Sequence, residues 1–371
     1  MDITGRARLK GLNRTGSMMR RLSEARSRPA AAAMARALLV LPVALGCLCS
    51  SACTCASGRV DPADRAVVTK ARQDLRPLRS VAAGRLPPAL RAYLDLYGIR
   101  AGGAGHPIGT FQSGGLVLAS QLIRSSKQGR GTVIIVHGYF DHSGIERHLI
   151  NRLTGEEYSV AIYDHPGHGL SEGRRISTKD FSIYETGFSD FLDVVTRNQP
   201  APYHVVAHSM GCTVVIDHLL RKETTRLKRV VLVAPLIRDS ISGPIRVFGH
   251  VVSPVIDYLP RVAERSSSDP AFLDSLKADP LQFRCVSTHW SRAFVAWQRS
   301  VRDSGPRRES PLILNAGNDT VIVDEFGQRW MKRTFPAGRF LTIEGGHHHL
   351  LNEAQPIREQ VLDIISSELR R

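Results

Sequence analysis

The chain has 371 residues, of which 42% are hydrophobic and 23% charged, and its formal net charge is +16. These proportions are ordinary for a globular protein, and the length allows one large α/β core with an insert. Residues 1–36 hold nine Lys and Arg residues against two acidic ones, and the remaining excess is spread as isolated arginines. No basic block is interleaved with aromatic residues, which argues against a nucleic-acid partner. The basic surface is either simply solvated or attracted to anionic lipid or envelope surfaces.

Residues 37–49 form an apolar run of 13 residues behind Arg36. A helix of this length is too short to cross a bilayer about 30 Å thick, which needs roughly 20 residues. The run is typical of the apolar segment of a secretory signal peptide. We therefore predict that residues 1–55 are a signal or leader segment, with Met34 as its true start. The protein is expected to be exported to the bacterial cell envelope, in the periplasm or anchored to a membrane.

Four cysteines lie at the end of this run and just after it, at positions 47, 49, 53 and 55. Residues 44–47 (Ala-Leu-Gly-Cys) are similar to a bacterial lipoprotein cleavage box, although the usual leucine is displaced by one position. A lipid anchor on Cys47, a plainly cleaved signal and an uncleaved anchor all remain open. The cysteine spacing argues against a zinc site. Cys212 and Cys285 are far apart in sequence, and we expect both to be buried small apolar residues rather than disulfide-bonded ones.

From residue 108 onward, strand-like apolar runs alternate with helix-like patterns. Residues 132–136 are a continuous β-branched run, as expected for a strand buried on both faces. The predicted strands cover residues 116–123, 132–136, 158–163, 203–208, 229–233, 312–314 and 339–343. The predicted helices cover residues 145–153, 181–197, 211–222 and 355–370. This alternation predicts an α/β domain over residues 108–371, with a mostly parallel central sheet and helices on both faces. Residues 56–107, rich in Arg, Pro, Ala and Gly, are expected to be a linker and N-terminal extension with a short helix near 90–97.

Residues 205–211 (Val-Val-Ala-His-Ser-Met-Gly) join an apolar strand directly to a helical pattern. A serine on such a turn stands above the sheet edge, and small residues are needed two positions before and after it because strand and helix pass very close. Ala207 and Gly211 meet this need, with alanine where glycine is usual. We predict that Ser209 is a nucleophile and that the Met210 amide, at the helix N-terminus, can face a developing oxyanion.

A serine nucleophile needs a base, and the base needs an acid that orients it. Asp319 follows the strand near 312–315, and three consecutive histidines at 347–349 follow the strand at 339–343. Both loops lie at the carboxyl ends of strands, and therefore at the same sheet edge as Ser209. Asp324 is the rival acid, and spacing alone does not choose among the three histidines. A triple-histidine metal site is disfavoured because adjacent side chains diverge and no clustered carboxylates accompany them.

The strand at 132–136 runs into a loop that begins His137-Gly138-Tyr139. Gly138 lets the backbone turn tightly, which leaves the Tyr139 amide free to point at a substrate. We predict that this amide is the second oxyanion donor and that His137 and Gly138 support the loop. His137 and His142 are interpreted as hydrogen-bonding residues of the loop rather than metal ligands.

Residues of about 236–305 interrupt the alternation of strands and helices. Apolar residues recur there at helix-like spacing, among them Val251, Phe272, Phe294 and Trp297. Because the segment lies directly before the strand that precedes Asp319, we predict that it is a helical lid. A helical subdomain packed for stability alone is the alternative.

Five segments between about residues 112 and 353 together resemble the monoacylglycerol lipase and lysophospholipase branch of the α/β-hydrolases, also called serine aminopeptidase S33-like or Hydrolase_4. They are a His-Gly-x-x-x-His-Ser loop at 137–143, an Asp-x-x-Gly-His-Gly-x-Ser-x-Gly segment at 164–173, the His-Ser-Met-Gly turn at 208–211, lid sequences at 268–270 and 278–281, and a terminal Gly-x-x-His-x-Leu-Leu-Asn-Glu at 345–353. The last segment selects His348 among the three histidines. Ala207 and the pair at 165–166 (His-Pro) depart from the family pattern at positions that are not catalytic.

The resemblance implies an α/β-hydrolase fold with a helical lid, and a serine hydrolase acting on esters of a single acyl chain, such as monoacylglycerol or lysophospholipid. Ser209, His348 and Asp319 would be nucleophile, base and acid, and no metal or organic cofactor is expected. A short-chain carboxylesterase, an acyltransferase on the same triad and a non-catalytic envelope binding protein remain as alternatives. The expected partner is a small lipid or ester substrate. Membrane-surface association through an N-terminal lipid or the basic surface stays open, and no oligomeric state is predicted.

Overall fold

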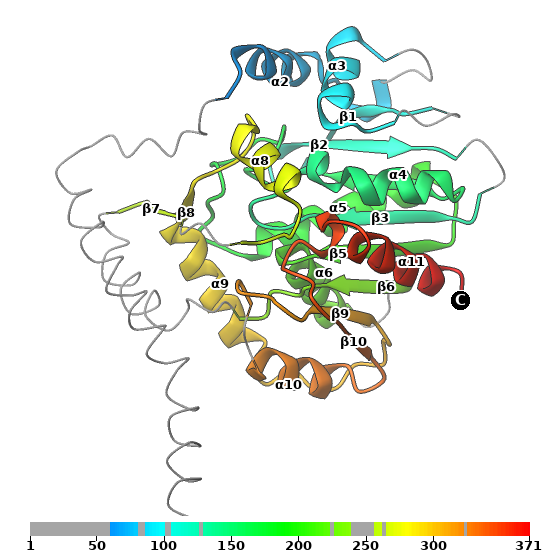
Figure 1. Ribbon diagram of the computed structural model, residues 1–371, viewed down its shortest axis with the longest axis vertical. Helices are drawn as coiled ribbons and strands as arrows, with labels where there is room; N and C mark the ends of the chain where they lie inside the picture. The colour runs from blue at the N-terminus through cyan, green and yellow to red at the C-terminus, as the bar shows by residue number, and fades with distance from the viewer. Residues whose placement is uncertain are drawn as a thin grey trace, which may run out of the picture.

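The computed structural model describes residues 60–80, 86–100, 105–125, 129–222, 226–238, 256–261, 265–322 and 325–371. Within these residues lies a central sheet of eight strands in the order β1-β2-β4-β3-β5-β6-β9-β10 (Figure 1). β2 pairs antiparallel with β1 and with β4, and all other neighbours are parallel, so the predicted mostly parallel sheet is confirmed. The strands are β1 (Ile108–Ser113), β2 (Leu116–Ile123), β3 (Thr132–Val136), β4 (Ser159–Tyr163), β5 (Tyr203–His208), β6 (Leu227–Val233), β9 (Leu312–Ala316) and β10 (Arg339–Ile343).

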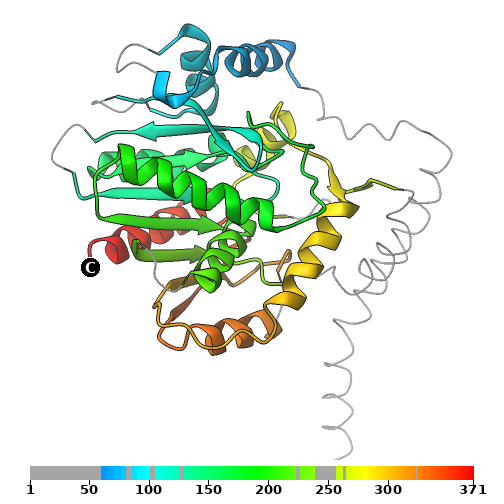
Figure 2. The same cartoon turned by 180° about the vertical axis from the view of Figure 1, so that it is seen from behind.

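Helices cover both faces of this sheet because its central strands are apolar on both faces (Figures 1 and 2). In β3, Ile134 and Val136 belong to one hydrophobic core, whereas Val133 and Ile135 belong to the other. Successive side chains of a strand point to opposite faces, so a continuous apolar run feeds both cores. Each fully buried Val or Ile stabilises the fold by roughly 1.5–3 kcal/mol. The covering helices are α5 (Ser182–Asn198) and α6 (Met210–Arg221) on the first core, and α4 (Arg147–Gly155) and α11 (Ile357–Leu369) on the second.

Two helices precede the sheet and pack along the edge formed by β1 and β2 (Figure 1). They are α2 (Pro62–Asp74) and α3 (Pro88–Tyr97), joined through the 3₁₀ turn η1 (Leu78–Ser80). Val68 and Leu90 are buried in the same core as α4 and α11. This part of the expected linker at 56–107 is therefore a folded layer of the domain. Its outward-facing charged residues give it the composition of a linker.

The described part of the segment between β6 and β9 contains two helices and a two-stranded antiparallel ribbon. Phe272 lies on α8 (Pro270–Ala278), and Phe294 and Trp297 lie on α9 (Thr288–Ser300), so the apolar spacing in the sequence corresponds to real helices. All three side chains are buried. The ribbon of β7 (Tyr258–Pro260) and β8 (Cys285–Ser287) was not predicted. Val251 lies outside the described residues.

Two further elements escaped prediction, namely β1 and α10 (Glu325–Thr334). β1 turns into β2 through Gly114 and Gly115, whose φ angles of 54° and 81° are those of a tight two-residue hairpin. α10 buries Trp330 and Met331 on one side, against the same core as α9. β1 extends the sheet and α10 extends the helices that cover it, at positions where the apolar pattern of the sequence is too short to predict an element.

The two cysteines of the domain differ. Cys212 is free and buried, as expected. Cys285 is disulfide-bonded, so the prediction that it would be an unpaired apolar residue is wrong. The leader, with its apolar run and the other four cysteines, lies outside the described residues. In the part of the chain that is described, no helix is both long enough and apolar enough to cross a membrane.

Candidate active site

Ser209 lies at the junction of β5 and α6, with φ 51° and ψ −115°. A non-glycine residue rarely adopts positive φ, and such strain is typical of functional sites. The turn is held by close backbone approach. A Cβ on Gly211 would lie 2.1 Å from the carbonyl oxygen of Val136 in β3. Ala207 is fully buried opposite Val136 in the parallel pairing of β5 with β3. The strand and helix therefore demand small residues on both sides of the serine.

The structure brings together the three side chains proposed as a triad. His348 Nε2 lies 2.9 Å from Ser209 Oγ, and His348 Nδ1 lies 2.9 Å from Asp319 Oδ2. His348 stands on the loop after β10 and Asp319 on the loop after β9, and both strands end at the edge where Ser209 stands. This arrangement suits proton transfer from Ser209 to His348, with Asp319 orienting the ring.

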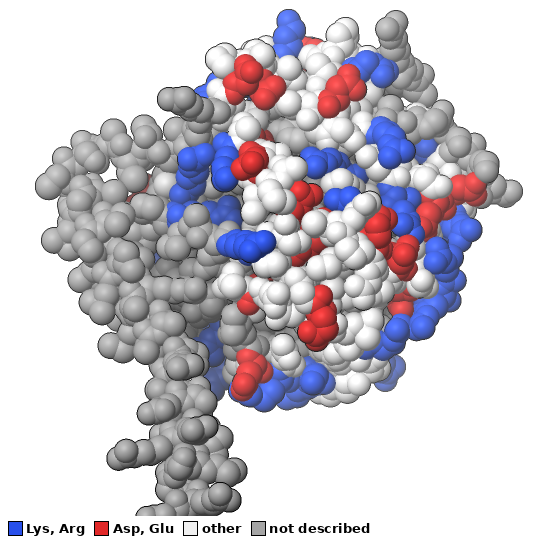
Figure 3. All heavy atoms as spheres, viewed as in Figure 1, with Lys and Arg blue, Asp and Glu red and all other residues white. Residues whose placement is uncertain are grey.

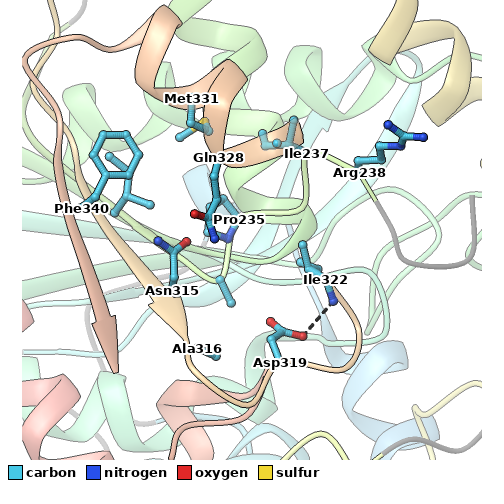
Figure 4. A pocket seen from close by; sticks show the side chains of 13 residues that line it. Pro235, Ile237, Arg238, Asn315, Ala316, Asp319, Ile322, Gln328, Met331 and Phe340 are labelled. Carbon is cyan, nitrogen blue, oxygen red and sulfur yellow. Dashed lines mark hydrogen bonds between the residues drawn. The ribbon is translucent and has the colours of Figure 1, made fainter. Parts of the chain in front are cut away.

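Asp319 is held as a carboxylate. Its Oδ1 accepts hydrogen bonds from the amides of Val321 and Ile322, both at 2.8 Å. Burial alone would raise the pKa of Asp319, but the hydrogen bond and charge of His348, together with these two amides, lower it below its usual value. Figure 4 shows Asp319 and Ile322, joined by this hydrogen bond, among the residues that line a hollow. The hollow is lined in part by Ala234, Ile237, Arg238, Asn315, Met331 and Phe340.

The neighbouring histidines have other partners. His347 Nδ1 lies 2.9 Å from Glu353 Oε1, and the His347 amide also donates to that carboxylate. His349 is buried, and its ring centroid lies 5.0 Å from that of His208. Geometry therefore selects His348, as the family motif did. Asp324, the rival acid, lies outside the described residues.

Tyr139 and Met210 supply two backbone amides near the serine, and across the described ranges no hydrogen bond uses either of them. Met210 is the first residue of α6, where amides have no partner inside the helix. Tyr139 is held by its side chain, whose hydroxyl donates to the Ile176 carbonyl at 2.6 Å and whose ring stacks on Trp290 at 3.9 Å. Both amides are thus available to an oxyanion.

The loop that carries Tyr139 is supported by buried histidines. His137 Nε2 accepts from the His165 amide at 3.0 Å, and His168 Nε2 donates to the Tyr139 carbonyl at 2.6 Å. Burial lowers the pKa of the His137, His165 and His168 rings, to about 3 for His168. His142 lies 2.8 Å from Asp279 of the insert, which raises the pKa of His142 against the effect of burial. These contacts are hydrogen bonds that hold the loop in place.

Asp141 and His208 also take part in this site, and the sequence motifs gave neither a role. His208 Nδ1 lies 3.0 Å from Asp141 Oδ2, and His208 Nε2 lies 3.1 Å from the backbone carbonyl of His348. Together with His349 they form the one group of described residues whose atoms lie close enough to hold a metal ion. Both ring nitrogens of His208 face oxygen atoms that accept hydrogen bonds, which favours a hydrogen-bonded pair over a metal centre. Only their place beside the motif residues could have drawn attention to them.

Comparison with known proteins identifies the family of this chain. The family model Hydrolase_4, described as serine aminopeptidase, S33, matches residues 127–355, more than half of the chain. The chain is 26% identical over 247 residues to the monoacylglycerol lipase of Mycolicibacterium smegmatis, covering 64% of this chain and 87% of that protein. It is 24% identical over 240 residues to the monoglyceride lipase of Homo sapiens, covering 61% and 78%.

Solved structures show the same fold. A soluble variant of monoglyceride lipase from Saccharomyces cerevisiae superimposes with a TM-score of 0.63 at 16% identity, covering 74% of this chain and 97% of that chain. Paleococcus ferrophilus monoacylglycerol lipase superimposes with a TM-score of 0.59 at 20% identity, covering 68% and 98%. The chain therefore belongs to the Hydrolase_4 (serine aminopeptidase, S33) family of α/β-hydrolases, in its monoacylglycerol lipase-like branch.

Proposed function

We propose that the protein is a serine hydrolase that cleaves carboxylic esters of single-acyl lipids, monoacylglycerol or lysophospholipid. The observation that carries the proposal is the continuous hydrogen-bonded chain from Ser209 through His348 to Asp319, beside two unused amides. The family membership and the lipid esterases among its relatives support the same reaction.

The reaction would follow from the geometry. Ser209 Oγ attacks the ester carbonyl while its proton passes to His348 Nε2, and Asp319 stabilises the resulting imidazolium. The amides of Tyr139 and Met210 stabilise the negative charge on the carbonyl oxygen, each donor being worth about 10²–10³ in rate. His348 then gives its proton to the departing alcohol, which leaves an acyl-enzyme. A water that loses a proton to His348 releases the fatty acid. These steps need no metal or organic cofactor.

We also propose that the protein works outside the cytoplasm, at the cell envelope. The apolar run behind Arg36 and the cysteine at position 47 suggest export and lipid attachment. The disulfide-bonded Cys285 supports export, because disulfides persist mainly in oxidising compartments. Cell fractionation with and without a Cys47→Ala substitution tests this. Loss of membrane association in the variant supports a lipid anchor, whereas a cytoplasmic wild-type protein would contradict the proposal.

Ester hydrolysis by the full chain tests the main proposal. Monoacylglycerol, lysophosphatidylcholine and short p-nitrophenyl esters would be compared, with Ser209→Ala as the inactive variant. Ser367→Ala, an exposed serine on α11, is the matched control and should keep full activity. Serine-dependent release of a long-chain acid identifies the substrate class.

The other outcomes separate the alternatives. Activity on short esters alone would indicate a general carboxylesterase. Transfer of the acyl group to an added alcohol in preference to water would indicate an acyltransferase. No serine-dependent activity and no reaction with a fluorophosphonate probe would leave a non-catalytic binding protein.

A further inference from the structure

We propose that Asp141 and His208 form a buried ion pair that positions the triad and the oxyanion loop, and that the pair must remain charged for full turnover. The proposal rests on the proposed function. Asp141 and His208 are positioning residues, because neither contacts the reacting atoms. Their exposed fractions are only 4% and 2%, so the pair is shielded from solvent.

The hydrogen bonds of His208 define its protonation state. One ring nitrogen faces the Asp141 carboxylate at 3.0 Å, and the other faces the His348 carbonyl at 3.1 Å. A carbonyl oxygen only accepts hydrogen bonds, so Nε2 must donate. Asp141 Oδ2 already accepts from the Gly138 amide at 3.2 Å, which favours a carboxylate that also accepts from His208 Nδ1. A neutral ring could donate to only one of these two acceptors, so the arrangement favours the imidazolium form of His208.

The pair connects three parts of the site. Asp141 holds Gly138, which directly precedes the oxyanion donor Tyr139. His208 directly precedes Ser209 and holds the backbone of the catalytic base His348. Nucleophile, base and oxyanion loop come from segments far apart in sequence, and this pair hydrogen-bonds across all three. Losing it would let them shift relative to one another, and misplacement of about 1 Å can cost roughly 10²-fold in rate.

Among the titratable groups that face His208, the pair of Asp141 and His208 carries the charge at neutral pH. Burial opposes a charge on His208, but the hydrogen bond and charge of Asp141 raise its pKa to about 9. Burial raises the pKa of Glu146 to about 8, and neither of its carboxyl oxygens has a partner in the described part of the chain. Burial lowers the pKa of His349 to about 3. The groups that face His208 are Asp141 on the oxyanion loop, Glu146 on the 3₁₀ turn η2 (Ser143–Glu146), and His348 and His349 on the loop after β10.

At neutral pH, therefore, Asp141 is negative, His208 positive, and both Glu146 and His349 neutral. As the pH rises through about 9, His208 loses its proton and can no longer donate to both partners. Glu146 ionises over a similar range and adds an unbalanced negative charge. We therefore expect kcat to fall as the pH rises through about 9, because the nucleophile, the base and the oxyanion loop are no longer held together.

The first experiment measures kcat and KM of the full chain between pH 6 and 10. Asp141→Asn keeps the shape and the acceptor for Gly138 but removes the charge. We expect it to lower kcat roughly 10–100-fold at pH 7 with little change in KM, and to remove the alkaline fall near pH 9. Asp217→Asn, a buried carboxylate paired with Arg221 away from the site, is the matched control and should keep the wild-type pH profile. A wild-type kcat and pH profile in Asp141→Asn would overturn the proposal.

A second measurement does not depend on ester hydrolysis. NMR of the wild-type chain with ¹⁵N-labelled histidine would follow its 14 histidines, with His208 assigned by its loss in His208→Gln. We expect both ring nitrogens of His208 to be protonated at pH 7 and to titrate near 9. A neutral His208 at pH 7 overturns the ion pair whatever the substrate. A charged His208 in a protein that hydrolyses no ester would instead count against the proposed function.

Discussion

Gly211→Ala gives the most direct test of the turn that carries Ser209. An alanine Cβ at this position would lie 2.1 Å from the carbonyl oxygen of Val136 and 2.7 Å from its carbonyl carbon. Both obstacles are backbone atoms of the central strand β3, so no side chain can rotate away. Ordinary contact begins near 3.4 Å, and α6 and β3 would therefore have to separate by about 1 Å. Overpacking of this kind costs about 3 kcal/mol or more.

Thermal unfolding and labelling with a fluorophosphonate probe would measure the two consequences. A loss of 3 kcal/mol corresponds to a fall in Tm of roughly 5 °C for a domain of this size, because the entropy of unfolding grows with chain length. Labelling should also slow, because Ser209 and Met210 move with α6.

The chain offers a matched control in Gly155→Ala at the end of α4. No atom lies within 4 Å of the Cβ position there, and its φ is not left-handed. This control should be neutral or more stable by up to about 1 kcal/mol, since alanine restricts the unfolded chain. If Gly211→Ala melts and reacts like the wild type, the packing argument for the small residue is refuted.

Three other substitutions test separate parts of the site. Asp319→Asn should lower kcat about 10⁴-fold while the fold is kept, because His348 loses the partner that orients it; a small change in kcat would remove Asp319 from the triad. Glu353→Gln should destabilise the protein by about 1.5–3 kcal/mol at pH 7, because the buried Glu353 carboxylate accepts hydrogen bonds from Ser268 and His347. Burial raises the pKa of Glu353, but these hydrogen bonds lower it below its usual value, so the carboxylate stabilises the fold above its unfolded pKa and this stabilisation is lost as the pH falls. In urea unfolding, the difference in stability between the variant and the wild type should therefore be smaller at pH 4 than at pH 7. An equal difference at both pH values would contradict this. Trp290→Ala should cost about 3–5 kcal/mol and lower kcat more than it raises KM, since the Tyr139 ring loses its stacking partner; unchanged kcat would show that the oxyanion loop holds without it.

The strands were predictable where burial on both faces leaves a continuous apolar run. The predicted bounds of β2, β3 and β10 match the structure at both ends. β1 was missed although Gly114 and Gly115 carry the hairpin signal, because its six residues show little apolar alternation. α2 was missed because most of its residues face solvent, so its composition resembles a linker. In both cases tertiary packing decides the structure.

The triad positions could be inferred from chain order, because carboxyl ends of parallel strands meet at one sheet edge. The contact between Asp141 and His208 could not, since these residues are 67 positions apart and only the fold joins them. Sequence spacing also left three histidines equivalent. Their distances to Ser209 and Glu353, which separate them, exist only in the folded chain.

Tyr139 links the core and the insert through a single side chain. Its amide is the proposed oxyanion donor, its ring stacks on Trp290 of α9, and its hydroxyl accepts a hydrogen bond from the Ser287 amide at 3.1 Å. The insert is therefore not a module that can be exchanged freely between relatives. In a chimera that took its insert from another hydrolase, the residues that contact the Tyr139 side chain would differ, and with them the position of the oxyanion donor. Tyr139 and its two contacts in the insert would have to be transplanted together, and in evolution we expect them to change together.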